Sequence, residues 1–248
     1  MSQARAGART AARVHEFGGA GPLIHLAHAN GYPPAAYRAF AEELTDLGRV
    51  VGARTRMLQP GTDPAALPDW RLLADDLLAV LDAEADGPVV GIGHSLGGVV
   101  TMYAALARPA RFRALVLIEP VFLPPEVLER ADAEADAFGR HPLVATALGR
   151  RDRFADPDEA FAHWRTKPVF AGLSDAVLAD YVAAALAPDP AAEARAARFR
   201  LAYPRDWEAR IYATPPRDVW RHVGALTVPT LALRGPRSDT LTPASWGY

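Results

Sequence analysis

Residues 88–98 read PVVGIGHSLGG. The first part of this stretch, residues 88–93, is a short apolar run, which is typical of a strand buried on both faces. Residues 96–107 follow almost directly and have helical character. We therefore expect a strand and a helix joined by a very sharp turn. Glycines at positions 93 and 97 favour such a turn, because they carry no side chains that would collide across it.

Ser95 lies at the centre of a Gly-x-Ser-x-Gly pattern in this turn. A strand-to-helix turn of this kind holds a serine in a strained backbone conformation with its hydroxyl exposed, as a nucleophile requires. The backbone N–H of Leu96 is expected at the helix N-terminus, where free N–H groups favour a developing oxyanion. The alternative is an incidental serine in a glycine-rich turn. Ser95 is one of only five serines in the chain, so we favour the nucleophile.

Apolar runs and helical patterns alternate on both sides of this stretch. Continuous apolar runs at 23–28, 49–53 and 114–118 predict strands buried on both faces. The periodic segments between them predict helices, among them residues 34–47, in which Tyr37, Phe40, Ala41 and Leu44 are spaced three or four apart. This alternation predicts an α/β fold, with a mostly parallel sheet and helices on both of its faces.

The alternation is interrupted once. Residues 121–212 hold no clear strand and are typical of a helical insertion. A predicted helix at 217–226 and a predicted strand at 229–234 then resume the pattern. We therefore expect a core domain in two parts, residues 14–120 and 213–248, with the insertion between them.

The loop after the first of these strands reads His28-Ala-Asn-Gly-Tyr-Pro33. It lies at the carboxyl end of its strand, where open α/β sheets bind ligands. Gly31 is expected to bend the loop and direct the Tyr32 N–H into the site as a second oxyanion donor. His28 and Asn30 are expected to support the shape of the loop. A plain turn is the alternative, since Asn-Gly and Tyr-Pro are strong turn formers.

These motifs resemble the α/β-hydrolase family from about Leu23 to the end of the chain. The stretch PVVGIGHSLGGVV, together with LVLIEP at 115–120, is similar to the family's nucleophile turn and following strand. The loop at 28–33 resembles that of a cap-bearing serine hydrolase subgroup with a His-x-Asn-Gly-x-Pro oxyanion loop. The resemblance implies that residues 121–212 are the cap.

The resemblance also implies a role for each motif residue. Ser95 is the expected nucleophile, and the N–H groups of Tyr32 and Leu96 are the expected oxyanion hole. The residues expected to support these loops are His28, Asn30, Gly31 and His94.

Residues 228–243 read VPTLALRGPRSDTLTP and resemble the strand and loop that deliver the family's triad acid. Asp239 holds that position, where it is expected to orient a catalytic histidine and stabilise its cation. A turn aspartate in a polar loop is the alternative. Glu119 is the rival acid, because it ends the strand after Ser95 and some family members take their acid from there. Its other interpretation is a buried structural carboxylate.

The family's chain order is nucleophile, acid and then histidine, but the last histidine here is His222. A serine without a base in hydrogen-bond reach is a poor nucleophile. The resemblance therefore implies a C-terminally incomplete copy without the catalytic histidine, last strand and last helix, and with 229–234 as an unprotected apolar edge. We expect this chain alone to be weak or inactive, since losing the base costs about 10⁴–10⁶ in rate. The alternative is a non-catalytic pseudoenzyme or a small-molecule binding module.

Composition argues against several other classes of protein. The 248-residue chain has a net charge of −2, which argues against a nucleic-acid or membrane-surface protein, and it has no cysteine, which fits a cytoplasmic protein. No metal-ligand spacing and no nucleotide-binding glycine motif occurs, so we expect no metal and no other cofactor. The expected partner is a small-molecule substrate with a carboxylic ester or related acyl bond. The oligomeric state stays open.

Overall fold

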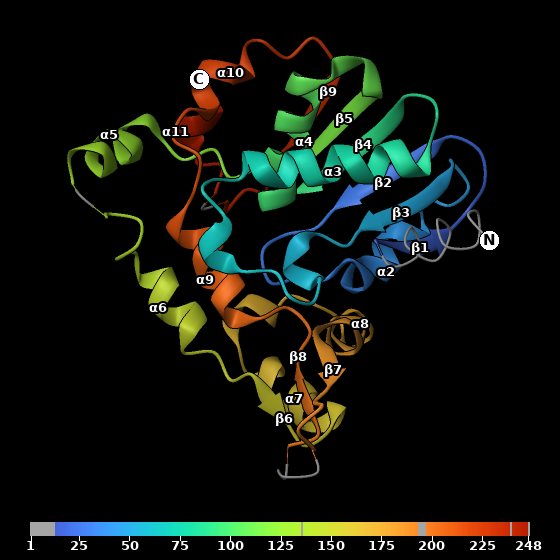
Figure 1. Cartoon of the computed structure of the whole chain (residues 1–248), viewed down its shortest axis with the longest axis vertical. Helices are drawn as coiled ribbons and strands as arrows, with labels where there is room; N and C mark the ends of the chain where they lie inside the picture. The colour runs from blue at the N-terminus through green and yellow to red at the C-terminus, as the bar shows by residue number, and fades with distance from the viewer. Residues whose placement is uncertain (1–12, 135, 193–196, 239, 248) are drawn as a thin grey trace.

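The computed structural model describes residues 13–134, 136–192, 197–238 and 240–247. Within these residues, six strands form one sheet in the order β1-β3-β2-β4-β5-β9 (Figure 1). β1 pairs antiparallel with β3, and every other neighbouring pair is parallel. The strands are β1 (Val14–Gly18), β2 (Leu23–Ala27), β3 (Arg49–Ala53), β4 (Val89–His94), β5 (Phe112–Ile118) and β9 (Thr230–Leu233).

Helices cover both faces of this sheet. On one face, α3 and α4 pack together and share a large buried apolar cluster with the strands. On the other face, α2 contributes Ala41 to a smaller cluster with β2, β3 and β4. These helices are α2 (Arg38–Glu42), α3 (Arg71–Glu84) and α4 (Leu96–Ala107), with α10 (Val219–Val223) beside α4. The predicted α/β fold, with a mostly parallel sheet and helices on both faces, is confirmed.

Residues 121–212 differ from the expectation of a purely helical segment. Three very short strands form an antiparallel sheet in the order β6-β8-β7. The strands are β6 (Arg153–Phe154), β7 (Leu186–Pro188) and β8 (Phe199–Leu201). Strands of two or three residues are too short to show an alternating pattern, which is why the sequence did not reveal them. The helices are α5 (Pro125–Ala133), α6 (Pro142–Leu148), α7 (Pro157–Arg165), α8 (Asp175–Ala185) and α9 (Arg205–Ala213).

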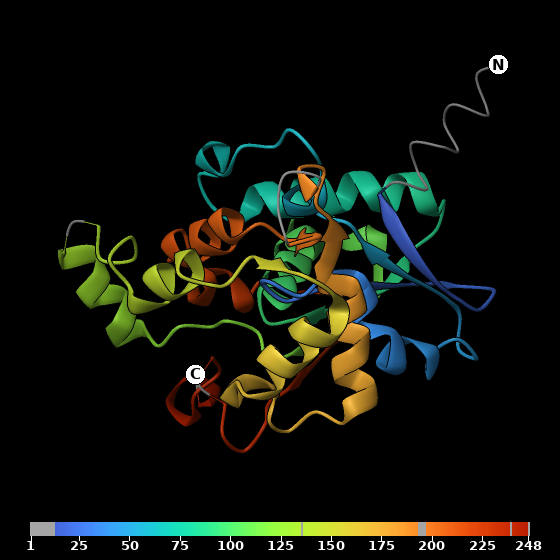
Figure 2. The same cartoon turned by 90° about the horizontal axis from the view of Figure 1, so that it is seen from below.

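Most of this segment lies at one end of the molecule, below the sheet in Figure 1 and in front of it in Figure 2. α8 packs against the 3₁₀ turn η1, which follows the loop after β2. The segment therefore covers the loop that was expected to supply an oxyanion donor. The 3₁₀ turns are η1 (Pro34–Tyr37), η2 (Arg56–Leu58), η3 (Pro64–Ala66), η4 (Pro109–Arg111) and η5 (Pro168–Phe170).

β9 is the edge strand of the described sheet. In this strand Leu231 is 55% exposed and Leu233 is 43% exposed within the described residues. The short α11 (Pro243–Trp246) follows β9. Among the described residues, no helix is long and apolar enough to cross a membrane.

Candidate active site

Ser95 occupies the turn between β4 and α4 with φ 54° and ψ −116°. Non-glycine residues rarely adopt positive φ, and holding one in such a region costs on the order of 1–3 kcal/mol. The turn is held by a hydrogen bond from the Ser95 N–H to the carbonyl oxygen of Ile118 in β5, at 2.9 Å. Ser95 therefore has the strained backbone that its sequence motif predicts.

Glycine is required on both sides of Ser95. A Cβ atom at Gly93 would lie 2.3 Å from the carbonyl oxygen of Gly97, and one at Gly97 would lie 2.1 Å from that of Ala27. Both contacts are with backbone atoms, which cannot rotate away. The expectation that these glycines permit the sharp turn is confirmed.

The Leu96 N–H begins α4 and has no acceptor among the described residues, because the first N–H groups of a helix lack intrahelical partners. It lies next to Ser95 at the positive end of the helix. Among the residues that the structure describes, no histidine is hydrogen-bonded to the Ser95 hydroxyl. Within the described residues, the structure thus places a free N–H beside the candidate nucleophile and no histidine hydrogen-bonded to it.

His28 anchors the first half of the loop after β2, here called the 28–32 loop. Its Nδ1 donates to the carbonyl oxygen of Ala29 at 2.9 Å, so its Nε2 accepts from the hydroxyl of Thr55, also at 2.9 Å. Burial lowers the pKa of His28 to about 4, and the hydrogen bond to Ala29 opposes this shift only in part. The side chain is therefore neutral near pH 7 and has both nitrogens occupied, which fits a supporting role and leaves no nitrogen for base catalysis.

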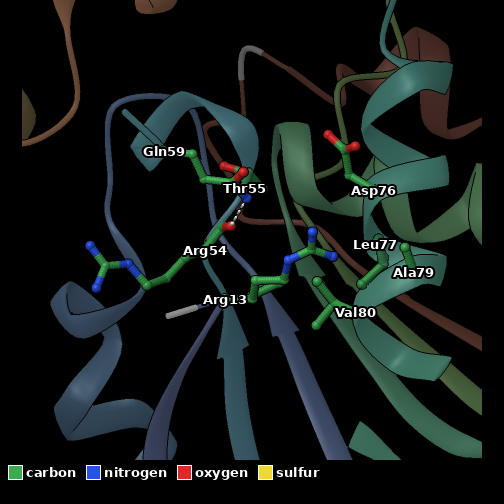
Figure 3. Close-up of a pocket in the computed structure, with 9 residues that line it drawn as sticks. Arg13, Arg54, Thr55, Gln59, Asp76, Leu77, Ala79 and Val80 are labelled. Carbon is green, nitrogen blue, oxygen red and sulfur yellow. Dashed lines mark hydrogen bonds between the residues drawn. The ribbon is translucent and has the colours of Figure 1, made fainter. Parts of the chain in front are cut away.

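A small cavity lies behind this anchor, between β3 and α3. Its volume is about 60 Å³, and its lining includes Arg13, Arg54, Thr55 and Asp76 (Figure 3). The Arg54 N–H donates to the Arg13 carbonyl oxygen at 2.6 Å. Substrate pockets usually enclose about 300–1,000 Å³, so this cavity is too small to bind an acyl substrate.

Asn30 and Gly31 turn the 28–32 loop towards the 121–212 segment. Asn30 Oδ1 accepts from the Tyr203 hydroxyl at 2.8 Å, and its Nδ2 donates to the Glu208 carbonyl oxygen at 3.1 Å. Gly31 has φ +77°, a conformation that favours glycine. The supporting role expected for both residues agrees with these contacts.

The Tyr32 N–H is not free to bind an oxyanion in this structure. Its N–H donates to the carbonyl oxygen of Ala29 at 3.2 Å and so closes the turn of the loop. Its ring contacts Tyr181 and Phe170 in the 121–212 segment, with centroids 5.0 and 6.2 Å away. Binding an oxyanion would require this long hydrogen bond to be shared or released, and the role of Tyr32 stays a prediction.

His94 precedes the candidate nucleophile and bonds to Tyr37 instead of to Ser95. The Tyr37 oxygen accepts from the Ala29 N–H at 2.9 Å and lies 2.8 Å from His94 Nδ1, which provides an acceptor for the buried hydroxyl proton. Burial lowers the pKa of His94, although the Glu119 carboxylate raises it in part. Tyr37 thus links the serine turn to the 28–32 loop. The sequence showed it only as one apolar position of a predicted helix.

Glu119 follows β5 and organises the loop in which Asp239 stands. Its carboxylate accepts hydrogen bonds from the Gly235 N–H and the Ser238 hydroxyl, and a longer one of 3.3 Å from the hydroxyl of Thr240. Burial alone would raise the pKa of Glu119, but these hydrogen bonds outweigh it and lower the pKa. These contacts fit a structural carboxylate, Asp239 itself lies outside the described residues, and the choice between Glu119 and Asp239 as the acid stays a prediction.

An ion pair between Arg150 and Glu208 lies over the 28–32 loop. Arg150 also donates to the Tyr181 hydroxyl at 3.0 Å. Burial raises the pKa of Glu208, and Arg150 opposes this shift in part. Burial alone would lower the pKa of Arg150, but Tyr181 and Glu208 outweigh it and raise that pKa. No sequence motif marks these residues, because their partners are distant along the chain.

The other histidines have structural surroundings. His141 accepts the Leu143 N–H at the start of α6, and His222 in α10 bonds to Asp218, which precedes that helix. His25 is fully buried in β2, and neither of its ring nitrogens has a partner. His15 and His163 make ring contacts with Phe17 and Phe154. None of these contacts includes Ser95.

The model of the family described as alpha/beta hydrolase fold matches residues 56–243. Among curated relatives, Lipase LipV of Mycobacterium tuberculosis is 48% identical over 66 residues, which are 26% of this chain and 25% of that protein. Monoglyceride lipase of Rattus norvegicus is 29% identical over 137 residues, which are 52% of this chain and 45% of that protein. The matched stretches thus span less than half the length of either relative.

Solved structures show the same fold. E-2-(acetamidomethylene)succinate hydrolase has a TM-score of 0.74 at 20% identity, covering 94% of this chain and 80% of that one. An alpha/beta hydrolase from Novosphingobium aromaticivorans has a TM-score of 0.67 at 26% identity, covering 94% of this chain and 79% of that one. At such identities these likenesses speak for the fold and not for a substrate.

Proposed function

The chain belongs to the alpha/beta hydrolase fold family, and on this basis we propose that it is a serine hydrolase acting on a carboxylic ester or a related acyl bond. The observation that carries the proposal is the backbone of Ser95, with φ 54° between two glycines that no other residue can replace. Strain of this kind persists where the surrounding structure enforces it, and it is concentrated at active sites. The names of the two lipase relatives favour an ester.

In the proposed reaction, the Ser95 oxygen attacks the acyl carbon and its proton passes to a base. The N–H groups of Leu96 and Tyr32 stabilise the negative charge that develops on the acyl oxygen. Collapse of this intermediate expels the alcohol and leaves an acyl-serine, which water then hydrolyses. Asp239 orients the imidazole that serves as base, and Glu119 holds the loop around Asp239.

In this proposal the core domain consists of residues 14–120 and 213–248, and residues 121–212 are the cap that closes over the site. The contacts of the 121–212 segment with the 28–32 loop support this division, because they place the segment over the candidate oxyanion donor.

The base is the missing element of the site. All seven histidines lie within the described residues, and none is hydrogen-bonded to Ser95 there. We therefore propose that this chain alone hydrolyses esters slowly, with the loss of about 10⁴–10⁶ in rate that accompanies removal of a triad base. Imidazole in solution can supply the missing group.

The test is hydrolysis of p-nitrophenyl butyrate at several imidazole concentrations, with the reaction of imidazole alone subtracted. We expect a protein-dependent rate that rises with imidazole and disappears in Ser95→Ala. Ser174→Ala is the matched control, because Ser174 is an exposed helix cap on α8 and should leave the rate unchanged. Equal rates for wild type and Ser95→Ala would reject the proposal.

The second candidate is a non-catalytic module that binds an acyl compound. The absence of a hydrogen bond between Ser95 and a histidine in the described residues favours it. Calorimetric binding of a non-hydrolysable ester analogue, together with no turnover at any imidazole concentration, would support this candidate over the hydrolase.

A further inference from the structure

We propose that Asn30 is a positioning residue through which the 121–212 segment holds the 28–32 loop in the shape needed for oxyanion binding. Its effect on catalysis rests on the proposed function, whereas its effect on the loop does not. The relationship that carries the proposal is the position of one buried amide between a loop of the core and two residues of the inserted segment.

Both polar atoms of the Asn30 amide form hydrogen bonds between the 28–32 loop and the 121–212 segment. Its oxygen accepts from the Tyr203 hydroxyl at 2.8 Å, and its nitrogen donates to the Glu208 carbonyl oxygen at 3.1 Å. All three residues are at least nine-tenths buried, so water does not replace these bonds when they break. Any displacement of the segment away from the loop therefore leaves Asn30 unpaired at a cost in free energy.

Gly31 lies beside the same tyrosine. Burial raises the pKa of Tyr203, and the nearby Gly31 backbone opposes this shift in part, while the Tyr203 proton is donated to Asn30. Space above Gly31 is also restricted, because an added Cβ atom would lie 3.1 Å from Arg150 Nη1 and 3.3 Å from the Glu208 carboxylate. The segment thus contacts the loop at the residue that turns Tyr32 into place.

The partners of Asn30 are themselves fixed. The carboxylate of Glu208 is paired with Arg150, and Arg150 also donates to the Tyr181 hydroxyl at 3.0 Å. This network joins three parts of the segment, namely the chain after α6, helix α8 and helix α9. The Glu208 carbonyl oxygen that Asn30 contacts therefore belongs to a residue whose side chain is tied to two other parts of the segment.

The two halves of the 28–32 loop have hydrogen-bond partners in different parts of the protein. His28 and Ala29 are hydrogen-bonded to the core, through Thr55 and Tyr37, whereas Asn30 is hydrogen-bonded to the inserted segment. Loss of the contact to Tyr203 should therefore loosen the second half of the loop and leave the first half in place. A bond that merely stabilised the fold would have no such asymmetry.

The test is hydrogen exchange of single backbone amides, measured by NMR, in Tyr203→Phe and Asn30→Ala. We expect the amides of Gly31 and Tyr32 to exchange about fivefold faster or more, the factor expected for one lost hydrogen bond. Exchange at Ala29 should not change. Tyr103→Phe is the matched control, because it removes a hydroxyl that bonds to Asp218 at 2.9 Å, away from the loop.

Kinetics with imidazole supplied provide the second measurement. Tyr203→Phe should lower kcat about fivefold and leave KM unchanged, because only stabilisation of the transition state is lost. Unchanged exchange rates at Gly31 and Tyr32 in both variants would overturn the proposal. An equal rise of the exchange rate at amides throughout the core would also overturn it. Faster exchange in a protein without Ser95-dependent turnover would support the positioning role and reject only the proposed hydrolase.

Discussion

The phenol oxygen of Tyr37 lies 2.8 Å from Nδ1 of His94, although 57 residues separate them in the chain. The same oxygen accepts the Ala29 N–H, and because a buried hydroxyl proton also needs an acceptor, we infer that it is donated to His94. His94 is thereby held as the neutral tautomer with its proton on Nε2. This one contact ties the residue before the candidate nucleophile to the loop of the second candidate oxyanion donor.

Replacement of Tyr37 with phenylalanine should destabilise the protein by about 1–3 kcal/mol, because a buried N–H and a buried imidazole nitrogen both lose their partner. Urea unfolding of Tyr37→Phe measures this change. The ¹⁵N shifts of His94 should also show a mixture of tautomers where the wild type shows one. An unchanged stability together with an unchanged His94 spectrum would contradict the account of this contact.

Replacement of Gly97 with alanine should prevent the turn around Ser95 from forming. The new Cβ atom would lie 2.1 Å from the Ala27 carbonyl oxygen, so we expect a loss of more than about 2 kcal/mol or a failure to fold. Gly224→Ala is the control, because nothing lies within 4 Å of its added Cβ atom and its φ is −69°. Its stability should stay within about 0.5 kcal/mol of wild type. Equal effects of the two substitutions would contradict the close packing of the turn.

The sequence predicted the residues that local chemistry specifies. The turn at Ser95, its glycines and helix 96–107 could be predicted because the constraint lies within a few residues. Contacts such as those of Tyr37 and Asn30 could not be predicted, since they depend on how distant segments meet. The small sheet in residues 121–212 was missed for a different reason, because its strands are shorter than one period of a recognisable pattern.

Predicted helix 34–47 shows the limit of periodicity. The structure has the 3₁₀ turn η1 and the short helix α2 there, and Phe40 is 42% exposed although its spacing predicted a buried position. Strand β1 was not predicted either, because Val14–Gly18 has only one fully buried position and therefore carries a weak apolar signal.

Glu119→Gln should weaken the loop around position 239. The wild-type carboxylate accepts hydrogen bonds from three donors. The side-chain NH₂ group of glutamine cannot accept a hydrogen bond, so at least one of these donors would lose its acceptor. The hydrogen bonds lower the pKa of Glu119 in the folded protein, so its contribution to stability is present above its usual pKa and is lost as the pH falls through the lowered value. Urea unfolding should therefore show a gap between wild type and variant at pH 7 that narrows in acid. A gap independent of pH would contradict this role.

His25→Leu should make the protein more tolerant of acid. Burial lowers the pKa of His25 to about 3, so between pH 6.5 and 3 the unfolded chain binds a proton that the folded protein does not bind, and stability falls as the pH falls. At pH 5 this difference amounts to about 2 kcal/mol. The loss of stability from pH 8 to pH 5 should be smaller by this amount in His25→Leu than in wild type. His222→Gln, at a half-exposed histidine, is the control. Identical pH profiles for wild type and His25→Leu would contradict the prediction.

The most direct test of the central claim, that Ser95 is an activated nucleophile, is the site of covalent labelling by a fluorophosphonate. The protein is incubated with the probe with and without imidazole, and the labelled serine is mapped by mass spectrometry of peptides. We predict that Ser95 is labelled well before the exposed Ser174, and that imidazole accelerates labelling of Ser95 alone. Labelling of Ser95 at the same rate as Ser174, with no response to imidazole, would contradict the claim.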